Sequence, residues 1–185
     1  MTGLTGGFVD LPRDAAHAFR AAMNAMARPG TILPVLGATP PAPLSVAAGV
    51  LILTLCDPDT PVHLAGGHDR AEVRDWITFH TGAPFATLSD CVFAIGIWDA
   101  LLPLDAYPIG TPEYPDRSAT LIVEMPALLT KGTRLTGPGI RTEAHLNLPD
   151  PAALAANAAG FPLGLDLFLT AGADLAALPR STRIG

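Results

Sequence analysis

The sequence is short of charged residues and almost devoid of lysine. Charged residues make up 15% of its 185 residues, and Lys131 is the single lysine; a typical globular domain carries roughly 25% charged residues. The net charge of −6 argues against a nucleic-acid binder, which needs a basic face. Because hydrophobic residues make up 49% of the chain, a monomer would expose unusual apolar area, and we expect an oligomer.

Cysteine is equally scarce, and no apolar run is long. Cys56 and Cys91 stand far apart without CxxC spacing, so we expect two reduced core thiols that cannot hold an iron–sulfur cluster. The longest apolar run, about residues 44–56, is too short to span a bilayer comfortably. No signal peptide is visible. These absences predict a cytoplasmic protein that does not enter a membrane.

The alternation of helical and strand patterns favours an α/β fold. Residues 1–185 show no repeat and no linker that would split them, so we expect one domain. Late strands that follow one another without a helix predict a mixed central sheet with helices on its faces. The proline-rich stretch 101–116 is expected to be an irregular surface excursion. The predicted helices cover about 10–28, 44–55, 70–80 and 150–159, and the predicted strands cover 31–36, 62–65, 91–98, 119–125, 133–137 and 163–171.

Aspartates stand at the predicted starts of three helices. Asp10, Asp69 and Asp150 each have a side chain that can accept a hydrogen bond from a free N–H group of the first turn. In the first helix, Phe19 and Met23 recur at helical spacing with several alanines. This spacing predicts one apolar face.

The stretch RLTGPGI (134–140) looks like a phosphate-binding loop. A P-loop needs a lysine followed by serine or threonine, and Gly137-Pro138-Gly139 has neither after it. Pro138 also lacks one N–H group that a phosphate nest would use. Thr142 occupies the third glycine position of a dinucleotide-binding turn. A strand-ending turn that needs glycine is therefore favoured over a phosphate site.

An acidic residue lies inside an apolar strand near the end of the chain. Asp166 needs a partner there, because an unpaired buried charge is very costly. Arg180 and Arg183 are close in sequence and can supply that partner or bind an anion. The residues alone leave both alternatives open, an internal ion pair or an anion site.

The histidines match no catalytic or metal-binding motif. His63, His68 and His80 form neither H-E-x-x-H nor a Cys/His quartet, so no metal site is predicted. His80 at the end of the third helix can act as an acid–base group or as a helix-end cap. No serine lies in a G-x-S-x-G context.

Five stretches, taken in order, resemble the PhnH family of bacterial carbon–phosphorus lyase core subunits. Together they span nearly the whole chain, and residues 98–118 are the least characteristic part. The stretches are DAAHAFRAAMNAMARPG (14–30), LILTLCDPDTPVHL (51–64), FHTGAP (79–84), RLTGPGI (134–140) and FPLGLDLFLTAG with LPRSTRI (161–184).

The resemblance implies a role that the residues alone did not show. The family acts with partner subunits to make ribose-1-alkylphosphonate 5-triphosphate from ATP and an alkylphosphonate, and another subunit carries the radical iron–sulfur chemistry. It implies a homodimer inside a larger assembly, and a fold similar to the large domain of pyridoxal-phosphate-dependent transferases, a three-layer α/β/α arrangement without the cofactor. Lys131 stands between two predicted strands, a poor place for a reactive amine.

Two hypotheses follow from the resemblance and from the residues. In the first, the chain is an assembly subunit without independent activity, as the missing catalytic motifs indicate. In the second, it binds nucleotide or phosphonate directly and takes part in catalysis, with arginines on the phosphate oxygens. The candidate residues of the second hypothesis are Arg28, His80, Gly137, Gly139, Asp166, Arg180 and Arg183.

Overall fold

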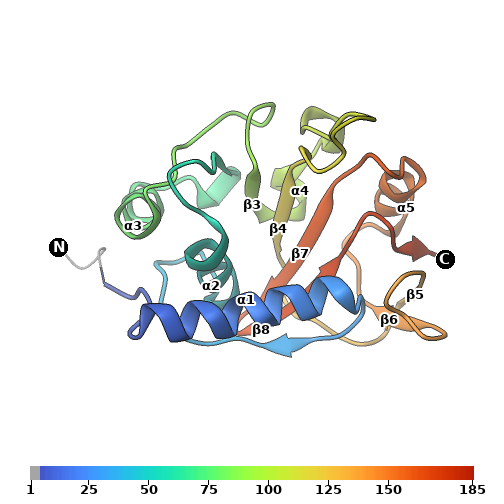
Figure 1. Cartoon of the computed structure of the whole chain (residues 1–185), viewed down its shortest axis with the longest axis horizontal. Helices are drawn as coiled ribbons and strands as arrows, with labels where there is room; N and C mark the ends of the chain where they lie inside the picture. Colours follow the sequence, from blue (N-terminus) through green and yellow to red (C-terminus); the bar gives the residue numbers. More distant parts are fainter. Residues whose placement is uncertain (1–4) are drawn as a thin grey trace.

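The computed structural model describes residues 5–185 and combines five α-helices with nine strands over that range (Figure 1). Two single-turn 3₁₀ helices lie at Gly66–His68 and Leu104–Ala106. The α-helices are α1 (Leu11–Ala27), α2 (Val46–Leu55), α3 (Ala71–Thr81), α4 (Trp98–Leu101) and α5 (Pro151–Ala159). The strands are β1 (Leu33–Pro34), β2 (Val62–Leu64), β3 (Phe93–Ile97), β4 (Thr120–Glu124), β5 (Thr133–Thr136), β6 (Ala144–Leu146), β7 (Asp166–Ala171), β8 (Asp174–Leu178) and β9 (Arg183–Ile184).

A mixed six-stranded sheet forms the centre of the protein, as the sequence predicts. Its strand order is β1-β8-β7-β4-β3-β2, in which β2, β3, β4 and β7 are parallel while β8 and β1 each run antiparallel to their neighbours. A separate antiparallel sheet has the order β6-β5-β9. The carboxyl ends of four parallel strands therefore meet at one edge of the large sheet.

Two apolar clusters cover the two faces of this sheet. On one face, buried residues of α1, α2 and α3 pack against alternate sheet residues such as Ile95, Ile122 and Phe168. On the other face, α4, α5 and the small sheet pack against the intervening residues, among them Leu121 and Leu169. Side chains of a strand alternate between faces, so neighbouring residues of one strand belong to different clusters. Figure 1 shows α3 and α5 on opposite sides of the sheet.

Two of the three predicted helix caps are confirmed. The Asp10 carboxylate accepts a hydrogen bond from the backbone N–H of Arg13, and the Asp150 carboxylate accepts one from Ala153. The prediction for Asp69 is wrong, since α3 begins at Ala71 with no side-chain cap and the Asp69 carboxylate pairs with Arg74 instead. Both oxygens of the Asp69 carboxylate accept hydrogen bonds from the Arg74 guanidinium, five residues on, instead of from the first turn of α3.

Strands β6, β8 and β9 and the short helix α4 were not predicted from the sequence. The antiparallel pair β7–β8 turns through Gly172 and Ala173, and Gly172 has a φ of +58°. A glycine between two apolar runs is typical of a tight hairpin, so this signal was present in the sequence. The predicted irregular stretch contains the single-turn helix Leu104–Ala106 and otherwise lacks long regular elements.

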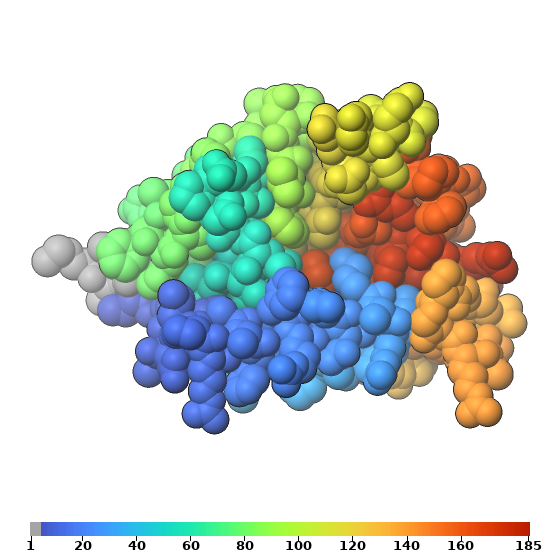
Figure 2. Space-filling model, viewed as in Figure 1, coloured from blue at the N-terminus to red at the C-terminus, as the bar shows by residue number. Residues whose placement is uncertain are grey.

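Only part of the apolar face predicted for α1 packs against the core. Ala18, Ala22 and Ala25 are buried against the core, while Phe19 is 49% and Met23 is 56% exposed. Small alanines let α1 lie close to α2 and β8, and the larger side chains remain outside. Figure 2 shows α1 as a ridge along one side of the molecular surface.

Candidate functional site

Asp166, the first residue of β7, and Arg180, two residues after β8, form an ion pair. Their side chains are only 26% and 12% exposed, and the Arg180 Nη2 lies 2.5 Å from Asp166 Oδ2. The Arg180 backbone N–H and Nε also donate to Asp166 Oδ1, at 2.8 and 3.1 Å. Nη1 donates to the Pro115 carbonyl at 2.8 Å, and Nη2 donates to the Ser118 hydroxyl at 2.5 Å.

These contacts occupy nearly all the donors of Arg180. A guanidinium has five N–H groups, and four of them are engaged here. The side chain thus ties the start of β7 to the stretch 115–118 and to the chain end. Of the two alternatives that the sequence left open, the geometry of Arg180 favours the internal ion pair.

The turn at Gly137-Pro138-Gly139 has the geometry of a strand-ending turn. The Ile140 N–H donates to the Gly137 carbonyl at 3.1 Å, and Gly139 has a φ of +79°. Proline followed by a residue with positive φ is the pattern of a type II β-turn. A Cβ at Gly139 would lie 2.0 Å from the Ala27 carbonyl oxygen, so only glycine fits against the end of α1.

Three stretches far apart in sequence meet at this turn. Gly139 lies against the end of α1, where Arg28 follows the last helical residue. Gly137 lies against the backbone of Ser181 and Arg183, and Thr136 pairs with Arg183 between β5 and β9. The structure therefore brings Arg28 and Arg183, both exposed, to the same glycine turn.

His80 lies elsewhere, in the last turn of α3. Its ring is 5.0 Å from the Trp76 ring, centroid to centroid, and a Cβ at Gly7 would lie 2.5 Å from His80 Cε1. Burial lowers the pKa of His80, and a hydrogen bond with the Thr5 backbone opposes that shift. His80 packs under the segment that precedes α1, and the structure does not bring it to the glycine turn.

A cavity of about 370 Å³ lies at the carboxyl edge of the parallel strands. Ile97 and Glu124 end β3 and β4, Gly172 follows β7, and His68 follows β2. Ser45, at the start of α2, closes another side. In open α/β sheets, ligands bind in the crevice outside the carboxyl ends of the strands, so this cavity is the candidate ligand site of the fold.

Glu124 is held by two hydrogen bonds at the edge of this cavity. The Ser45 backbone N–H donates to Glu124 Oε1 at 2.7 Å, and the Thr170 hydroxyl donates to Oε2 at 2.9 Å. Each carboxylate oxygen can accept two hydrogen bonds, so each keeps an accepting position. The side chain is fixed in place and still able to bind a donor.

His68 lines the same cavity and is only 3% exposed. Neither ring nitrogen has a hydrogen-bond partner among residues 5–185. Burial is the main cause that lowers the pKa of His68, and the charge of Arg70 lowers it further while Glu124 opposes the shift. The ring is therefore neutral near pH 7, and both of its nitrogens are buried without a partner in the described part of the chain.

Sequence reasoning missed this group. In the sequence, His68 is considered only as a metal ligand, and Glu124 is given no role and falls inside the predicted strand 119–125. The available signal was a carboxylate that directly follows the apolar run of β4, because residues at the carboxyl ends of parallel strands converge.

A second, larger cavity lies between α5 and the stretch 102–109. Its volume is about 690 Å³ and its walls are mainly apolar. Tyr107 lines it, its buried hydroxyl has no partner among the described residues, and burial raises the pKa of Tyr107 to about 12. Tyr107 therefore stays protonated at neutral pH.

Each of metal, thiol and pyridoxal phosphate chemistry requires particular side chains in particular surroundings. Residues 5–185 contain no group of three histidine, cysteine or acidic side chains placed to hold a metal ion. Burial raises the pKa of Cys56 to about 12 and of Cys91 to about 11, so both are unreactive thiols. Lys131 is exposed between β4 and β5 and does not line the cavity at Glu124. The residues therefore do not fit pyridoxal phosphate, which needs a lysine in its site.

No helix within residues 5–185 has the length and apolar character needed to cross a membrane.

The fold and the site define a mixed α/β protein with a small polar cavity at the carboxyl edge of its sheet. A family model described as "Bacterial phosphonate metabolism protein (PhnH)" matches residues 6–185. The chain belongs to this PhnH family. It is similar to "Alpha-D-ribose 1-methylphosphonate 5-triphosphate synthase subunit PhnH" of Rhizobium meliloti (strain 1021), with 44% identity over 97% of this chain and 94% of that protein. It is also similar to "Putative C-P lyase subunit protein HtxG" of Stutzerimonas stutzeri, with 31% identity over 90% of this chain and 84% of that protein.

Proposed function

We propose that this chain is a subunit of the complex that forms ribose-1-alkylphosphonate 5-triphosphate from ATP and an alkylphosphonate in phosphonate catabolism. The observation that carries the proposal is the 44% identity, over nearly the full length of both chains, to a subunit of that synthase. The chain acts with partner subunits and has no independent activity. The engagement of Arg180 in internal contacts supports this assembly role.

Reconstitution with the partner subunits tests the proposal. With ATP and methylphosphonate, the complete set should release adenine and form the ribosyl triphosphate, as followed by chromatography and ³¹P NMR. The set without this chain should form none, and the chain alone should be inactive. Equal product formation without the chain would refute the proposal.

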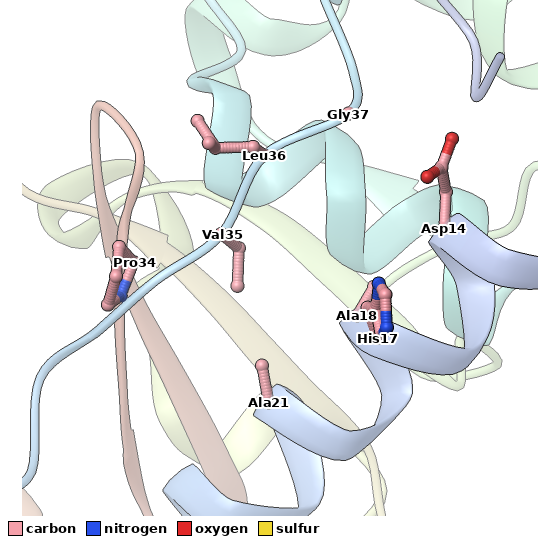
Figure 3. A pocket seen from close by; sticks show the side chains of 8 residues that line it. All are labelled: Asp14, His17, Ala18, Ala21, Pro34, Val35, Leu36 and Gly37. Atoms are coloured by element: carbon pink, nitrogen blue, oxygen red, sulfur yellow. The ribbon is translucent and has the colours of Figure 1, made fainter. Parts of the chain in front are cut away.

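We further propose that the exposed side of α1 joins two copies of the chain in a homodimer. Phe19 and Met23 lie uncovered one turn apart on α1. A groove of about 320 Å³ between α1 and the segment 34–37 lies on a different side of this helix and is not part of the proposed interface. Figure 3 shows Asp14, His17 and Ala21 of α1 beside this groove, with Val35 on the facing segment. A two-fold axis beside Phe19 and Met23 would pack the same patch against itself.

Sedimentation velocity tests this interface with two matched variants. Met23→Asp places a charge on the proposed interface and should shift the chain to monomer. Ile109→Asp places a charge on another exposed apolar residue, 42% exposed, and should leave the dimer intact. A Met23→Asp protein that sediments as the wild type does would rule out this surface.

A second candidate function is anion binding at the glycine turn. Arg28 and Arg183 adjoin the turn and are exposed, and within residues 5–185 no hydrogen bond or ion pair engages either guanidinium. Paired arginines suit phosphate or phosphonate oxygens. In the assembled complex, Arg28→Ala with Arg183→Ala should weaken ATP or methylphosphonate binding by calorimetry, whereas Arg141→Ala should not. Unchanged binding in the double variant would exclude this site.

Finer features of the chain follow from the same proposal. We propose that residues 1–185 form one domain, that its fold is similar to the large domain of pyridoxal-phosphate-dependent transferases, and that it works without that cofactor in the cytoplasm. The mixed sheet with helices on both faces and the exposed position of Lys131 support these points.

A further inference from the structure

The larger cavity, between α5 and the stretch 102–109, is an apolar groove that reaches the protein surface. Its volume is about 690 Å³, and Leu102 and Ile109 on one wall are each 42% exposed. On the other wall, α5 presents the small residues Ala156 and Gly160. In Figure 2 the yellow stretch and the orange-red helix lie side by side at the surface. Exposed apolar surface of this kind usually marks an interaction site.

Hydrogen bonds within the chain hold both walls of this groove in place. The Gly164 N–H donates to the Ile109 carbonyl at 3.1 Å and joins one wall to the other. On α5, the Asn157 amide donates to the Leu165 carbonyl at 2.9 Å and accepts from the Leu165 N–H at 2.8 Å. The groove is therefore formed before a partner binds, and such preorganisation lowers the cost of association.

We propose that this groove docks a basic amphipathic helix of a partner protein. The apolar face of that helix lies in the groove, and its lysine or arginine side chains lie along the edges. As a docking site for a partner subunit, the groove extends the assembly role proposed above and rests on it. It involves neither the cavity at Glu124 nor the exposed side of α1.

The charges of both walls favour a basic partner. Asp105 is exposed and is the one charged side chain among the described residues that line the groove. Arg117 lies just after the first wall in sequence and stacks on the Tyr114 ring, 4.0 Å from its centroid. The stretches that build the walls, 99–116 and 150–164, contain no lysine, arginine or histidine. Complementary charge steers a partner to such a surface and selects against acidic ones. The acidic residues of the two stretches are Asp99, Asp105, Glu113, Asp116 and Asp150.

The groove suits a helix better than an extended segment. The residues that line it lie in α5, in the 3₁₀ helix Leu104–Ala106 and in loops, and none of them belongs to a strand of either sheet. An extended peptide binds mainly by pairing its backbone with a strand edge, which this groove does not provide. A helix satisfies its own backbone hydrogen bonds, so it can bury an apolar face at little polar cost. Ala156 and Gly160 are small enough to let its backbone come close to α5.

Three labelled peptides, added to the full chain, test this docking site. The first has about 14 residues, close to four helical turns, with leucines at helical spacing and lysines elsewhere. The second has glutamate in place of every lysine. The third has the same leucines and lysines in strict alternation, which favours a strand.

The first peptide should bind in the groove and the other two should bind poorly. In ¹H–¹⁵N spectra of the chain, the first peptide should shift the amide signals of α5 and of residues 102–109 in a saturable way. By fluorescence anisotropy, the second and third peptides should bind at least about tenfold more weakly, a difference of about 1.4 kcal/mol.

Two matched variants of α5 separate docking in the groove from general attraction between a basic peptide and an acidic chain. Ala156→Arg places a long basic side chain in the groove and should weaken binding of the first peptide at least about tenfold. Ala159→Arg adds the same charge to the same helix outside the groove lining and should weaken binding less than about threefold. Both alanines are exposed and arginine is a good helix former, so circular dichroism should show both variants folded.

Four results would overturn the docking site. The first is no saturable binding of the first peptide up to about 1 mM, where even very weak binding is detected. The second is equal binding of the lysine and glutamate peptides, and the third is equal binding of the first peptide by the two arginine variants. The fourth is a dimer that Ala156→Arg dissociates in sedimentation velocity, because a second copy of the chain would then occupy the groove. These measurements need no other subunit, so they can fail while the reconstituted synthase still depends on this chain.

Discussion

The two polar regions beside the central sheet differ in how completely their groups are paired. At the C-terminal corner, Arg180 makes four side-chain hydrogen bonds to groups of the same chain. At the carboxyl edge, His68 is more deeply buried, yet it makes none among the described residues. A group whose bonds are all internal stabilises the fold, whereas a buried polar group without partners lowers its stability. The contrast can be tested by changing one region at a time.

The largest effect is expected from breaking the internal ion pair. Arg180→Ala leaves Asp166 partly buried without a counter-charge and frees the 115–118 stretch, so the free energy of unfolding should fall by about 2–4 kcal/mol. Urea denaturation followed by circular dichroism measures this change. The matched control is Arg134→Ala, because the Arg134–Glu143 pair is 2.7 Å long but its side chains are 54% and 49% exposed. Loss of this exposed pair should lower the free energy of unfolding by less than about 1 kcal/mol. Equal losses in the two variants would contradict the view that the buried Arg180 pair stabilises the fold more.

A slightly smaller effect is expected at the glycine turn. Gly139→Ala forces a Cβ against the Ala27 carbonyl and places alanine at a φ of +79°. The free energy of unfolding should therefore fall by about 2–3 kcal/mol. Gly172 has a φ of +58° but open space around its Cβ position. Gly172→Ala should therefore cost only about 1 kcal/mol. If the two variants have the same midpoint in urea, the close approach of Gly139 to α1 adds nothing to the cost of the substitution.

The smallest effect on stability at neutral pH is expected at His68. His68→Leu removes a buried group that has no internal partner, so stability at pH 7.5 should change by no more than about 1 kcal/mol in either direction. A loss as large as that of Arg180→Ala would show that His68 is structural and would remove the contrast between the two regions.

The pH dependence of stability gives an independent check on His68. Its pKa in the folded chain is lowered, mainly by burial, so its contribution is fully present above the unfolded pKa of about 6.5 and is lost as the pH falls below that value. His80, whose pKa is also lowered, acts in the same direction. Wild-type stability should therefore decline between about pH 7 and 5, and His68→Leu should show a shallower decline in the same urea titrations. Identical slopes would contradict the burial of a neutral His68.

The sequence predicted the mixed α/β fold and most of its elements because these depend on local patterns. Apolar runs such as 119–125 identify strands, and Asp150 before a proline identifies the start of α5. It could not place Phe19 and Met23 outside, because helical spacing does not say which side meets the core. It also missed Glu124, whose role depends on a strand that lies beside others only after folding.

The sequence by itself determined the chemistry available to this protein. It set the scarcity of lysine and cysteine, the high content of hydrophobic residues, and the ordered stretches that identify the family. Only the tertiary structure decided which polar groups pair with one another. Asp166 and Arg180 are separated by a hairpin that brings them together, while His68, Glu124 and Ser45 come from three segments that meet at one sheet edge. Hydrogen bonds act over about 3 Å, so such partners are set by three-dimensional position rather than by separation along the chain.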